Sequence, residues 1–416
     1  MTLDAFRLER GLYFASSALL VALTLLVPLA EKQPVNAVAA LFAIMAVTLL
    51  ALRSRLLLRS WDAIDWAMLA LFVSAVLSTV FGWGGSTRYH GIAEAAIHIV
   101  MFLYLRHGGH DEATLRRLAT AVIVGTTLAA SGTLVSHAPG LPIQLPGVRG
   151  SIRSALYTGI TLMLCIGLAL HAQGIRRHVA LGVVFFLLIM TLSMASRAVS
   201  VGLGICLIIG CIAHFHNKAP KYALISIIVL VIAFALQPNS TVEQTKKAKF
   251  KELVELVTAK NISPNDQARI EIWRASWTWI ARGEHVLFGI GPRNYHLIDK
   301  DRLGLDPPLR FAVTRESSHA HNLFLTRYIE QGLVGLSALI VLLVLIARHL
   351  LHDAIRRRTS WAWWAALGGW WLPFFSGMVG SPWNHDYVWL AVFTFALYEA
   401  TRNRAPEACP PAFRTN

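Results

Sequence analysis

The run LFLTRYIEQGLVGLSALIVLLVLIARHL, at residues 323–350, decides the class of fold. A helix needs about 20 predominantly apolar residues to cross the hydrocarbon core of a bilayer. This run exceeds that length, and its charged residues stand near its two ends. It therefore predicts a helix that spans a membrane.

Eleven other apolar runs share this character, and together they predict an all-α polytopic membrane protein. We place the twelve spans at about residues 12–30, 35–52, 62–81, 91–105, 117–136, 155–172, 179–195, 198–214, 221–237, 323–350, 361–380 and 386–400. A tight turn near Ser196 joins the seventh span to the eighth. The composition agrees, because only 15% of the residues are charged, whereas soluble domains carry about 25%. Soluble enzymes, secreted disulfide scaffolds and disordered chains are thereby excluded.

The net charge of +15 comes from 38 Lys and Arg residues against 23 Asp and Glu residues. The basic residues stand in short clusters between apolar runs, which is the pattern of the positive-inside rule. One set of connecting segments holds 19 of them, whereas the short loops on the other side hold five, namely Lys32, Arg88, Arg149, Arg153 and Arg197. We therefore expect both termini in the cytoplasm and no nucleic-acid partner.

The chain divides into four parts: nine spans at residues 1–237, a long loop at 238–322, three spans at 323–400 and a tail at 401–416. Long loops escape the charge rule, so we place this loop outside the cytoplasm. Unstructured loops above about 15 residues are uncommon unless they are functional. The long loop is therefore the part of the chain in which we expect function.

Two amphipathic helices are expected inside the long loop. Residues 241–260 carry an apolar face and a lysine-rich face, which suits either a solvated surface or a helix on anionic headgroups. Residues 266–282 predict a second helix. Its apolar face is expected to contain Ile270, Trp273, Trp277 and Ile280.

Candidate site residues gather where the loop returns to the membrane. The stretch SSHAHNLFL places His319, His321 and Asn322 directly before the tenth span. Guanidinium groups suit phosphate oxygens, so arginines on this side predict a lipid phosphate or pyrophosphate ligand. The candidate arginines are Arg88, Arg149, Arg153, Arg197, Arg269 and Arg293, and His90 is a further candidate beside Arg88. A structural role for the histidines and snorkelling of Arg197 to the interface are the alternatives.

Missing motifs narrow the chemistry. The sequence has no Walker A motif, no set of zinc ligands and no nucleophile elbow. Asp299 and Asp301 resemble an Asp-x-Asp metal motif, but no other acidic cluster accompanies them, so we expect neither a metal nor a cofactor. A neutral histidine can accept a proton from a hydroxyl, and arginines can stabilise a departing pyrophosphate. The fitting reaction is attack of a sugar hydroxyl on a lipid-linked glycosyl diphosphate.

One motif pairs the histidine with glycines in the following span. His321-Asn322, then nine residues, then Gly332-Leu-Val-Gly335 resembles the pattern His-[Asn/Ser/Gln]-x9-Gly-x-x-Gly of the O-antigen ligases (WaaL type) in the Wzy-C superfamily.

Three further motifs carry the same resemblance. Ser196-Arg197 resembles the Ser-Arg pair of that family, and Arg269 with Trp273 resembles its Arg-x-x-x-Trp segment. The stretch LFGIGPRNYH, which contains Gly289 and Gly291, resembles the family's Pro-Leu-Phe-Gly-Val-Gly-Pro-like stretch. The sequence departs from that pattern where His285-Val286 replaces the usual proline position.

The resemblance implies a GT-C-like fold of about twelve transmembrane helices with one large helical periplasmic loop. It implies metal-independent, inverting transfer of O-antigen from undecaprenyl pyrophosphate to a sugar hydroxyl of lipid A–core oligosaccharide, in lipopolysaccharide biosynthesis at the bacterial inner membrane. It maps the general base onto His321 and the essential arginines onto Arg197 and Arg269. The expected partners are this donor, this acceptor and membrane lipids, and a monomer is expected.

Relatives with another acceptor stay open as alternatives, namely an O-antigen polymerase or a protein O-oligosaccharyltransferase of the same superfamily. A transporter is a third possibility, because twelve spans also suit that class. Transporters often contain internal repeats and midplane sites, whereas this sequence shows no repeat and its candidate residues cluster at one face.

Overall fold

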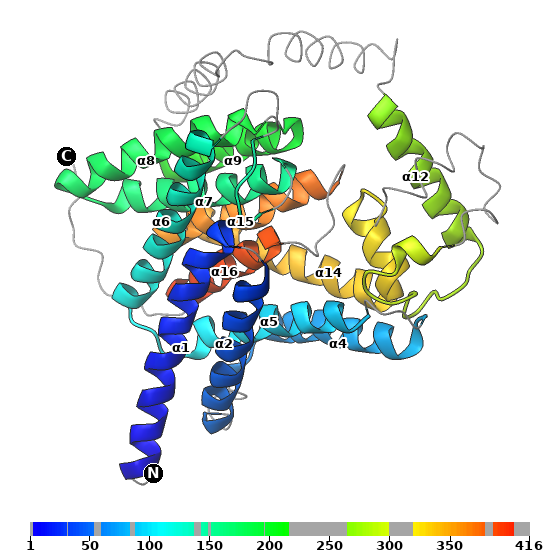
Figure 1. The fold of residues 1–416 in the computed structure, drawn as a ribbon, viewed down its shortest axis with the longest axis horizontal. Helices are drawn as coiled ribbons and strands as arrows, with labels where there is room; N and C mark the ends of the chain where they lie inside the picture. Colours follow the sequence, from blue (N-terminus) through cyan, green and yellow to red (C-terminus); the bar gives the residue numbers. More distant parts are fainter. Residues whose placement is uncertain are drawn as a thin grey trace.

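The computed structural model describes residues 3–30, 32–53, 60–83, 88–136, 143–148, 151–194, 196–215, 264–298, 319–378 and 386–402. Every regular element in these ranges is a helix (Figure 1), which confirms the predicted all-α class. The predicted span at 221–237 and the predicted helix at 241–260 lie outside the described residues, as do Asp299 and Asp301.

The helices follow the predicted spans closely. They are α1 (Leu3–Leu29), α2 (Lys32–Leu52), α4 (Ala63–Phe81), α5 (Arg88–His107), α6 (Glu112–Ser136), α7 (Ser151–His171), α8 (Gly174–Ser193), α9 (Arg197–Phe215), α12 (Pro264–Ala281), the short 3-10 helix η3 (Tyr295–Leu297), α14 (Leu323–Ile355), α15 (Trp361–Gly377) and α16 (Asp386–Arg402). Eleven of the twelve predicted spans coincide with α1, α2, α4 to α9 and α14 to α16.

Within the described ranges, eight helices are long and apolar enough to cross a membrane, so the protein is a multi-pass membrane protein. They are α1, α2, α4, α6, α7, α8, α9 and α14. Helices α15 and α16 have 17 residues each, which corresponds to about 26 Å of helix. Helix α5 has 20 residues but carries polar and charged side chains along its length.

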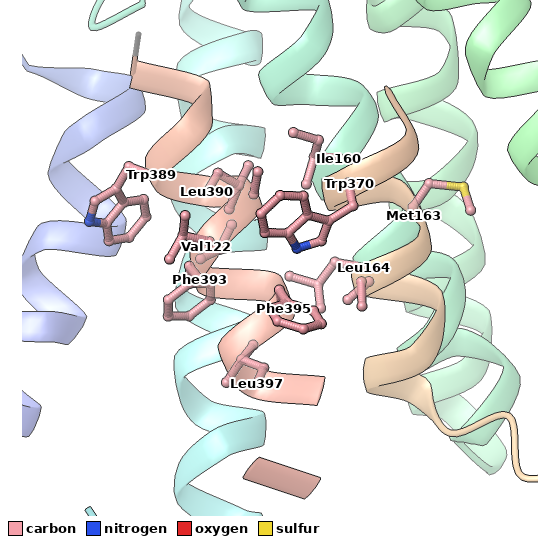
Figure 2. Packing of buried hydrophobic residues seen from close by; sticks show 14 of the residues in the cluster. Val122, Ile160, Met163, Leu164, Trp370, Trp389, Leu390, Phe393, Phe395 and Leu397 are labelled. Carbon is pink, nitrogen blue, oxygen red and sulfur yellow. The ribbon is translucent and has the colours of Figure 1, made fainter. Parts of the chain in front are cut away.

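Helices α15 and α16 lie in the interior of the bundle. Figure 2 shows Trp370 of α15 and Phe395 of α16 beside Leu164 of α7, and the Trp370 and Phe395 ring centroids are 5.4 Å apart. Gly369 lets the two helices approach closely, because a Cβ there would overlap the hydroxyl of Thr394. Lipid tails are as apolar as these side chains, so close packing rather than water exclusion stabilises this contact.

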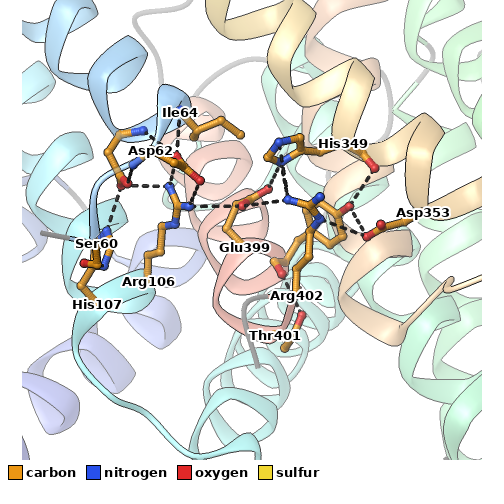
Figure 3. A network of polar contacts seen from close by, with 12 residues as sticks. Ser60, Asp62, Ile64, Arg106, His107, His349, Asp353, Glu399, Thr401 and Arg402 are labelled. Carbon is orange, nitrogen blue, oxygen red and sulfur yellow. Dashed lines mark hydrogen bonds and ion pairs between the residues drawn. The ribbon is translucent and has the colours of Figure 1, made fainter. Parts of the chain in front are cut away.

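Buried charges join α4, α5, α14 and α16 at one end of the bundle (Figure 3). Arg106 of α5 pairs with Asp65 of α4 at 2.9 Å and with Glu399 of α16 at 3.7 Å. The Nδ1 atom of His349 on α14 lies 2.8 Å from Glu399 Oε1. An unpaired buried charge is strongly destabilising, so these pairs fix which helices meet here. We call this the ionic end, and the opposite end, where α14 begins, the histidine end.

Candidate functional site at the histidine end

Helix α14 is interrupted at Gly332, whose φ of 64° and ψ of −164° lie outside the helical range. Glycine alone adopts this conformation at low cost. The break leaves carbonyl groups before it and N–H groups after it without their helical partners. Because buried backbone groups need hydrogen bonds, the partners must come from another part of the chain.

The segment 285–291 supplies these partners. Four backbone hydrogen bonds of 2.8–3.2 Å join it to α14, and with the donor first they are Leu333 to Val286, Val334 to Leu287, Ile290 to Ile329 and Gly291 to Glu330. We call these four bonds the interlock. The interlock makes one structural unit of two motifs that are well separated in sequence.

The predicted motif glycines permit the close approach in the interlock. A Cβ on Gly289 would overlap the backbone of Glu330, and a Cβ on Gly332 would overlap the backbone of Leu287. Gly291 has a φ of 105°, and a Cβ there would lie 2.6 Å from the Asn294 side chain. These three positions therefore require glycine, because any side chain would overlap neighbouring atoms.

Helix α4 holds the other side of the interlock. The Ser78 hydroxyl donates to the Glu330 carbonyl, and the Ser74 hydroxyl lies 2.9 Å from the side-chain oxygen of Gln331. Gly335 leaves room for that glutamine, because a Cβ on it would overlap the Gln331 side chain. The break in α14 is thus braced from α4 as well as from segment 285–291.

Helix α12 packs on this unit and confirms the second helix predicted in the long loop. Two residues of the predicted apolar face do not pack inside the protein, because Trp277 is 60% exposed and Ile270 is 40% exposed. The buried face instead contains Ile272, Ala275 and Trp279, which pack in one cluster with residues of segment 290–298 and of α14. Apolar residues occur on both sides of α12, so its periodicity alone did not indicate which side meets a partner.

A hydrogen bond fixes α12 to the same unit. The hydroxyl of Tyr295 lies 2.9 Å from the Ser276 hydroxyl, which itself donates to the Ile272 carbonyl at 2.8 Å. The Tyr295 hydroxyl is therefore the donor in this pair. The carboxylate of Glu330 in turn accepts hydrogen bonds from the backbone N–H groups of Arg293 and Tyr295. These contacts position α12, which carries Arg269, relative to the start of α14.

His319 and His321 stand directly before α14 with their ring centroids 4.3 Å apart. Asn322 caps the helix, because its Oδ1 accepts two backbone N–H groups of the first turn at 3.0 Å and its Nδ2 donates to the Met378 carbonyl at 3.1 Å. His321 has a φ of 48°, in the left-handed region that non-glycine residues rarely occupy. Backbone strain of this kind costs about 1–3 kcal/mol and clusters at functional sites.

The environment keeps both imidazoles neutral. Burial, with the neighbouring His321 and Arg153, lowers the pKa of His319 to about 3. Burial and the charge of Arg269 lower the pKa of His321 to about 4. Near pH 7 each ring therefore carries a nitrogen that can accept a proton. Arg153 of α7 and Arg269 of α12 act on this pair, so the structure brings four of the predicted site residues together.

The Ser196-Arg197 pair marks the start of α9. The Ser196 side chain is buried, and its hydroxyl accepts the Val199 N–H at 3.4 Å, as an N-cap residue does. Helix α8 ends at Ser193 and α9 begins at Arg197, which confirms the predicted tight turn. The side chain of Arg197 lies outside the described part of the structure.

The other predicted site residues are not among the four that the structure brings together. Arg149 and the side chain of Arg88 lie outside the described residues. His90 is exposed in the first turn of α5. Arg293, with a φ of 63°, forms an ion pair with Glu94 of α5. Trp273 of α12 is partly buried against the cluster that holds this helix.

The family model described as O-antigen ligase, Wzy_C, matches residues 179–340. This segment of the chain is similar to the O-antigen ligase family. The matched segment begins in α8 and includes the Ser196-Arg197 pair, α12, the two histidines and the interlock. The resemblance drawn from the motifs is confirmed, and the family consists of glycosyltransferase-like ligases that use lipid-linked glycans. No curated protein matches the chain.

Several residues that build the candidate site were missed by the sequence analysis. Glu330 and Arg327 are charged residues inside an apolar run, and charge at membrane depth is a signal of function that was available. Ser74 and Ser78 gave no such signal, because serines in α4 become informative only once α14 is placed beside them.

Proposed function

We propose that this O-antigen ligase domain transfers O-antigen polysaccharide from undecaprenyl pyrophosphate to a sugar hydroxyl of lipid A–core oligosaccharide, in lipopolysaccharide biosynthesis. One observation carries the proposal: His321 has a lowered pKa, adopts a left-handed backbone conformation directly before the capped start of α14, and lies within electrostatic range of Arg269. A neutral base beside a permanent cation suits a hydroxyl nucleophile and an anionic leaving group.

The reaction is a single displacement. The acceptor hydroxyl oxygen forms a bond to the anomeric carbon of the donor, and the bond from that carbon to the pyrophosphate oxygen breaks. His321 takes the hydroxyl proton, and undecaprenyl pyrophosphate leaves with the electron pair. Because the nucleophile enters opposite the leaving group, the anomeric configuration inverts, as in a GT-C type glycosyltransferase.

Arginines stabilise the leaving group in this proposal. Arg269 and Arg197 bind the pyrophosphate, whose charge grows as the bond breaks. His319 and Arg153 lie beside His321 and contribute to donor binding. Pyrophosphate is a good leaving group at neutral pH, so the step requires neither a metal nor a nucleotide. Arg88, His90, Arg149 and Arg293 are the further residues that we assign to contacts with the glycan or the acceptor.

The arrangement also explains why a histidine with a low pKa serves as the base. In the free site, burial and Arg269 disfavour the charged imidazolium. A bound pyrophosphate adds negative charge next to Arg269 and so raises the pKa of His321. The base therefore strengthens when the donor is present.

The distribution of basic residues supports an orientation with the histidine end in the periplasm and both termini in the cytoplasm. Arginines concentrate at the ionic end, at the starts or ends of helices: Arg53, Arg106, Arg116, Arg117, Arg176, Arg177, Arg348, Arg356, Arg357, Arg358 and Arg402. Short cytoplasmic loops carry such an excess. The bacterial inner membrane is the proposed location.

A transfer assay with purified protein tests the function. Wild type is mixed with undecaprenyl-pyrophosphate glycan and lipid A–core in the presence of EDTA and without nucleotides. His321→Ala is run beside His178→Ala, which changes an exposed histidine of α8 at the ionic end. We expect glycan-bearing lipid A from wild type and His178→Ala only. Full activity of His321→Ala would refute the proposed base.

Relatives with other acceptors are distinguished in the same assay. A growing glycan chain and an acceptor protein are offered separately in place of lipid A–core. Product with one of these acceptors, and none with lipid A–core, would assign the domain to polymerisation or to protein glycosylation.

A further inference from the structure

A partly open cavity lies between α4, α5, α14 and α16 at the histidine end. Its walls are mainly apolar and include Leu71, Phe72, Ile99 and Val392. The polar residues of its lining are Glu94, His98, Arg293, Thr326, Arg327, Glu330 and Gln331. Neither His319 nor His321 belongs to the lining, so the cavity does not contain the proposed general base.

Three polar groups in this cavity are incompletely paired among the described residues. Glu330 is 95% buried, and its Oε1 atom makes no hydrogen bond. The guanidinium of Arg327 and the imidazole of His98 form no hydrogen bond and no ion pair there, although Arg327 lies within electrostatic range of both other groups. Buried polar groups are nearly always satisfied. The unpaired Oε1 atom of Glu330, with the half-buried Arg327 and His98 around the same cavity, therefore indicates a ligand.

The charges define what that ligand must carry. Glu94 and Arg293 pair with each other, so their charges cancel. What is left is the cation of Arg327 and the free carboxylate oxygen of Glu330. A complementary ligand therefore presents an anion to Arg327 and a hydrogen-bond donor or cation to Glu330, and its net charge is near zero. A polyprenyl diphosphate offers no hydrogen-bond donor to the free oxygen of Glu330.

Depth and wall chemistry favour a lipid. Arg327 lies four residues into α14, or about 6 Å along its axis. The headgroup layer of a bilayer is about 5–7 Å thick on each side. The apolar walls from α4, α5 and α16 continue below this level and suit acyl chains.

We propose that this cavity is a binding site for a zwitterionic phospholipid of the ethanolamine type. Its phosphate binds Arg327, and its primary ammonium donates a hydrogen bond to Glu330 Oε1. Because Glu330 also holds the backbone of Arg293 and Tyr295, the lipid stabilises the segment that forms the interlock. The site does not depend on which glycan acceptor the ligase uses.

Lipid binding to the delipidated, detergent-solubilised protein tests the proposal. Native mass spectrometry compares phosphatidylethanolamine, phosphatidylcholine and phosphatidylglycerol with matched acyl chains. The choline lipid has the same net charge but no N–H donor, and the glycerol lipid is anionic. We expect the ethanolamine lipid to bind at least about tenfold tighter than the choline lipid, since a hydrogen bond to a charged group is worth that much.

Three variants assign the binding to this cavity. Arg327→Gln should weaken binding of the ethanolamine and choline lipids together, because both carry the phosphate. Glu330→Gln should chiefly abolish the preference between them. Arg117→Gln, which changes an exposed arginine of α6, is the control and should bind like wild type.

The opposite results are equally clear. Equal affinity of wild type for the three lipids overturns the proposal, as does an unchanged preference in Glu330→Gln. If undecaprenyl pyrophosphate binds wild type and loses affinity in Arg327→Gln while the ethanolamine lipid shows no preference, the cavity belongs to the glycan donor. Because the readout is lipid binding, a failure of the proposed glycan transfer would leave these outcomes unaffected.

Discussion

Replacing Gly332 by alanine tests whether the interlock builds the site. The residue has a φ of 64° and a ψ of −164° inside α14, and a Cβ there would overlap the backbone of Leu287. Alanine must therefore either strain the backbone or push segment 285–291 away from α14. Both responses disturb the segment that begins with His321.

The expected loss of stability follows from these contacts. A non-glycine residue in this backbone region costs about 1–3 kcal/mol. The bonds from Leu333 to Val286 and from Val334 to Leu287 lie at the point of overlap, and each lost hydrogen bond costs about 1 kcal/mol. The sum is about 3–5 kcal/mol. A displacement of about 1 Å at the proposed catalytic histidine would also lower kcat by about 100-fold.

Unfolding in a mixed-micelle titration with SDS measures the first effect, and the transfer assay measures the second. Tryptophan fluorescence is a suitable signal, because Trp83 and Trp279 pack beside the interlock with ring centroids 5.2 Å apart. Gly132→Ala is the matched control, since that glycine lies in α6 with open space around it. If Gly332→Ala unfolds within about 0.5 kcal/mol of wild type and keeps its activity, a range usual for neutral surface changes, the reasoning about the break is wrong.

Three further predictions concern the electrostatics and positioning of the site. Because the pKa of His321 is lowered to about 4, acid should stop the proposed transfer only as pH falls through about 4. At pH 5 about 90% of this base is still neutral, against about 3% for an ordinary histidine. A kcat/KM profile with its midpoint near 6.5 would contradict this prediction. Arg269→Gln should raise the pKa of His321 and shift the acid side of the pH–activity profile to higher pH. Arg269→Lys keeps the charge and should leave the acid side of the profile in place. Identical profiles for the two variants would argue for a purely structural arginine. Tyr295→Phe removes the hydrogen bond to Ser276 and should destabilise the protein by about 1 kcal/mol in the same SDS titration, while an unchanged midpoint would show that packing alone positions α12.

The sequence predicted the helices well because a span is set by its own composition. The run at 323–350 is apolar whichever helices surround it, and eleven predicted spans coincide with helices. It did not predict the ionic end, because Arg106, Asp65 and Glu399 come from three helices and no local pattern relates them. Likewise, α12 was expected but its buried face was not, since the partner surface on α14 decides it.

The candidate site was predictable in its motifs but not in its construction. The spacing of His321, Gly332 and Gly335 indicated that these residues act together, and the break at Gly332 supplies the physical reason. The left-handed conformation of His321 and the low pKa of its ring depend on neighbours from other segments. Periodicity in one segment carries no information on such contacts.

The bracing of α14 by α4 has a consequence for biogenesis. The Ser74 hydroxyl is synthesised before its partner Gln331, which follows it by 257 residues. At a synthesis rate of about 5–20 residues per second, α4 spends roughly 13–50 s in the membrane before that partner exists. During this interval the hydroxyl can remain bonded to the Leu71 carbonyl of its own helix, 2.8 Å away in the finished protein. The interlock therefore forms late in synthesis, and a nascent chain that stops before α14 lacks the candidate site.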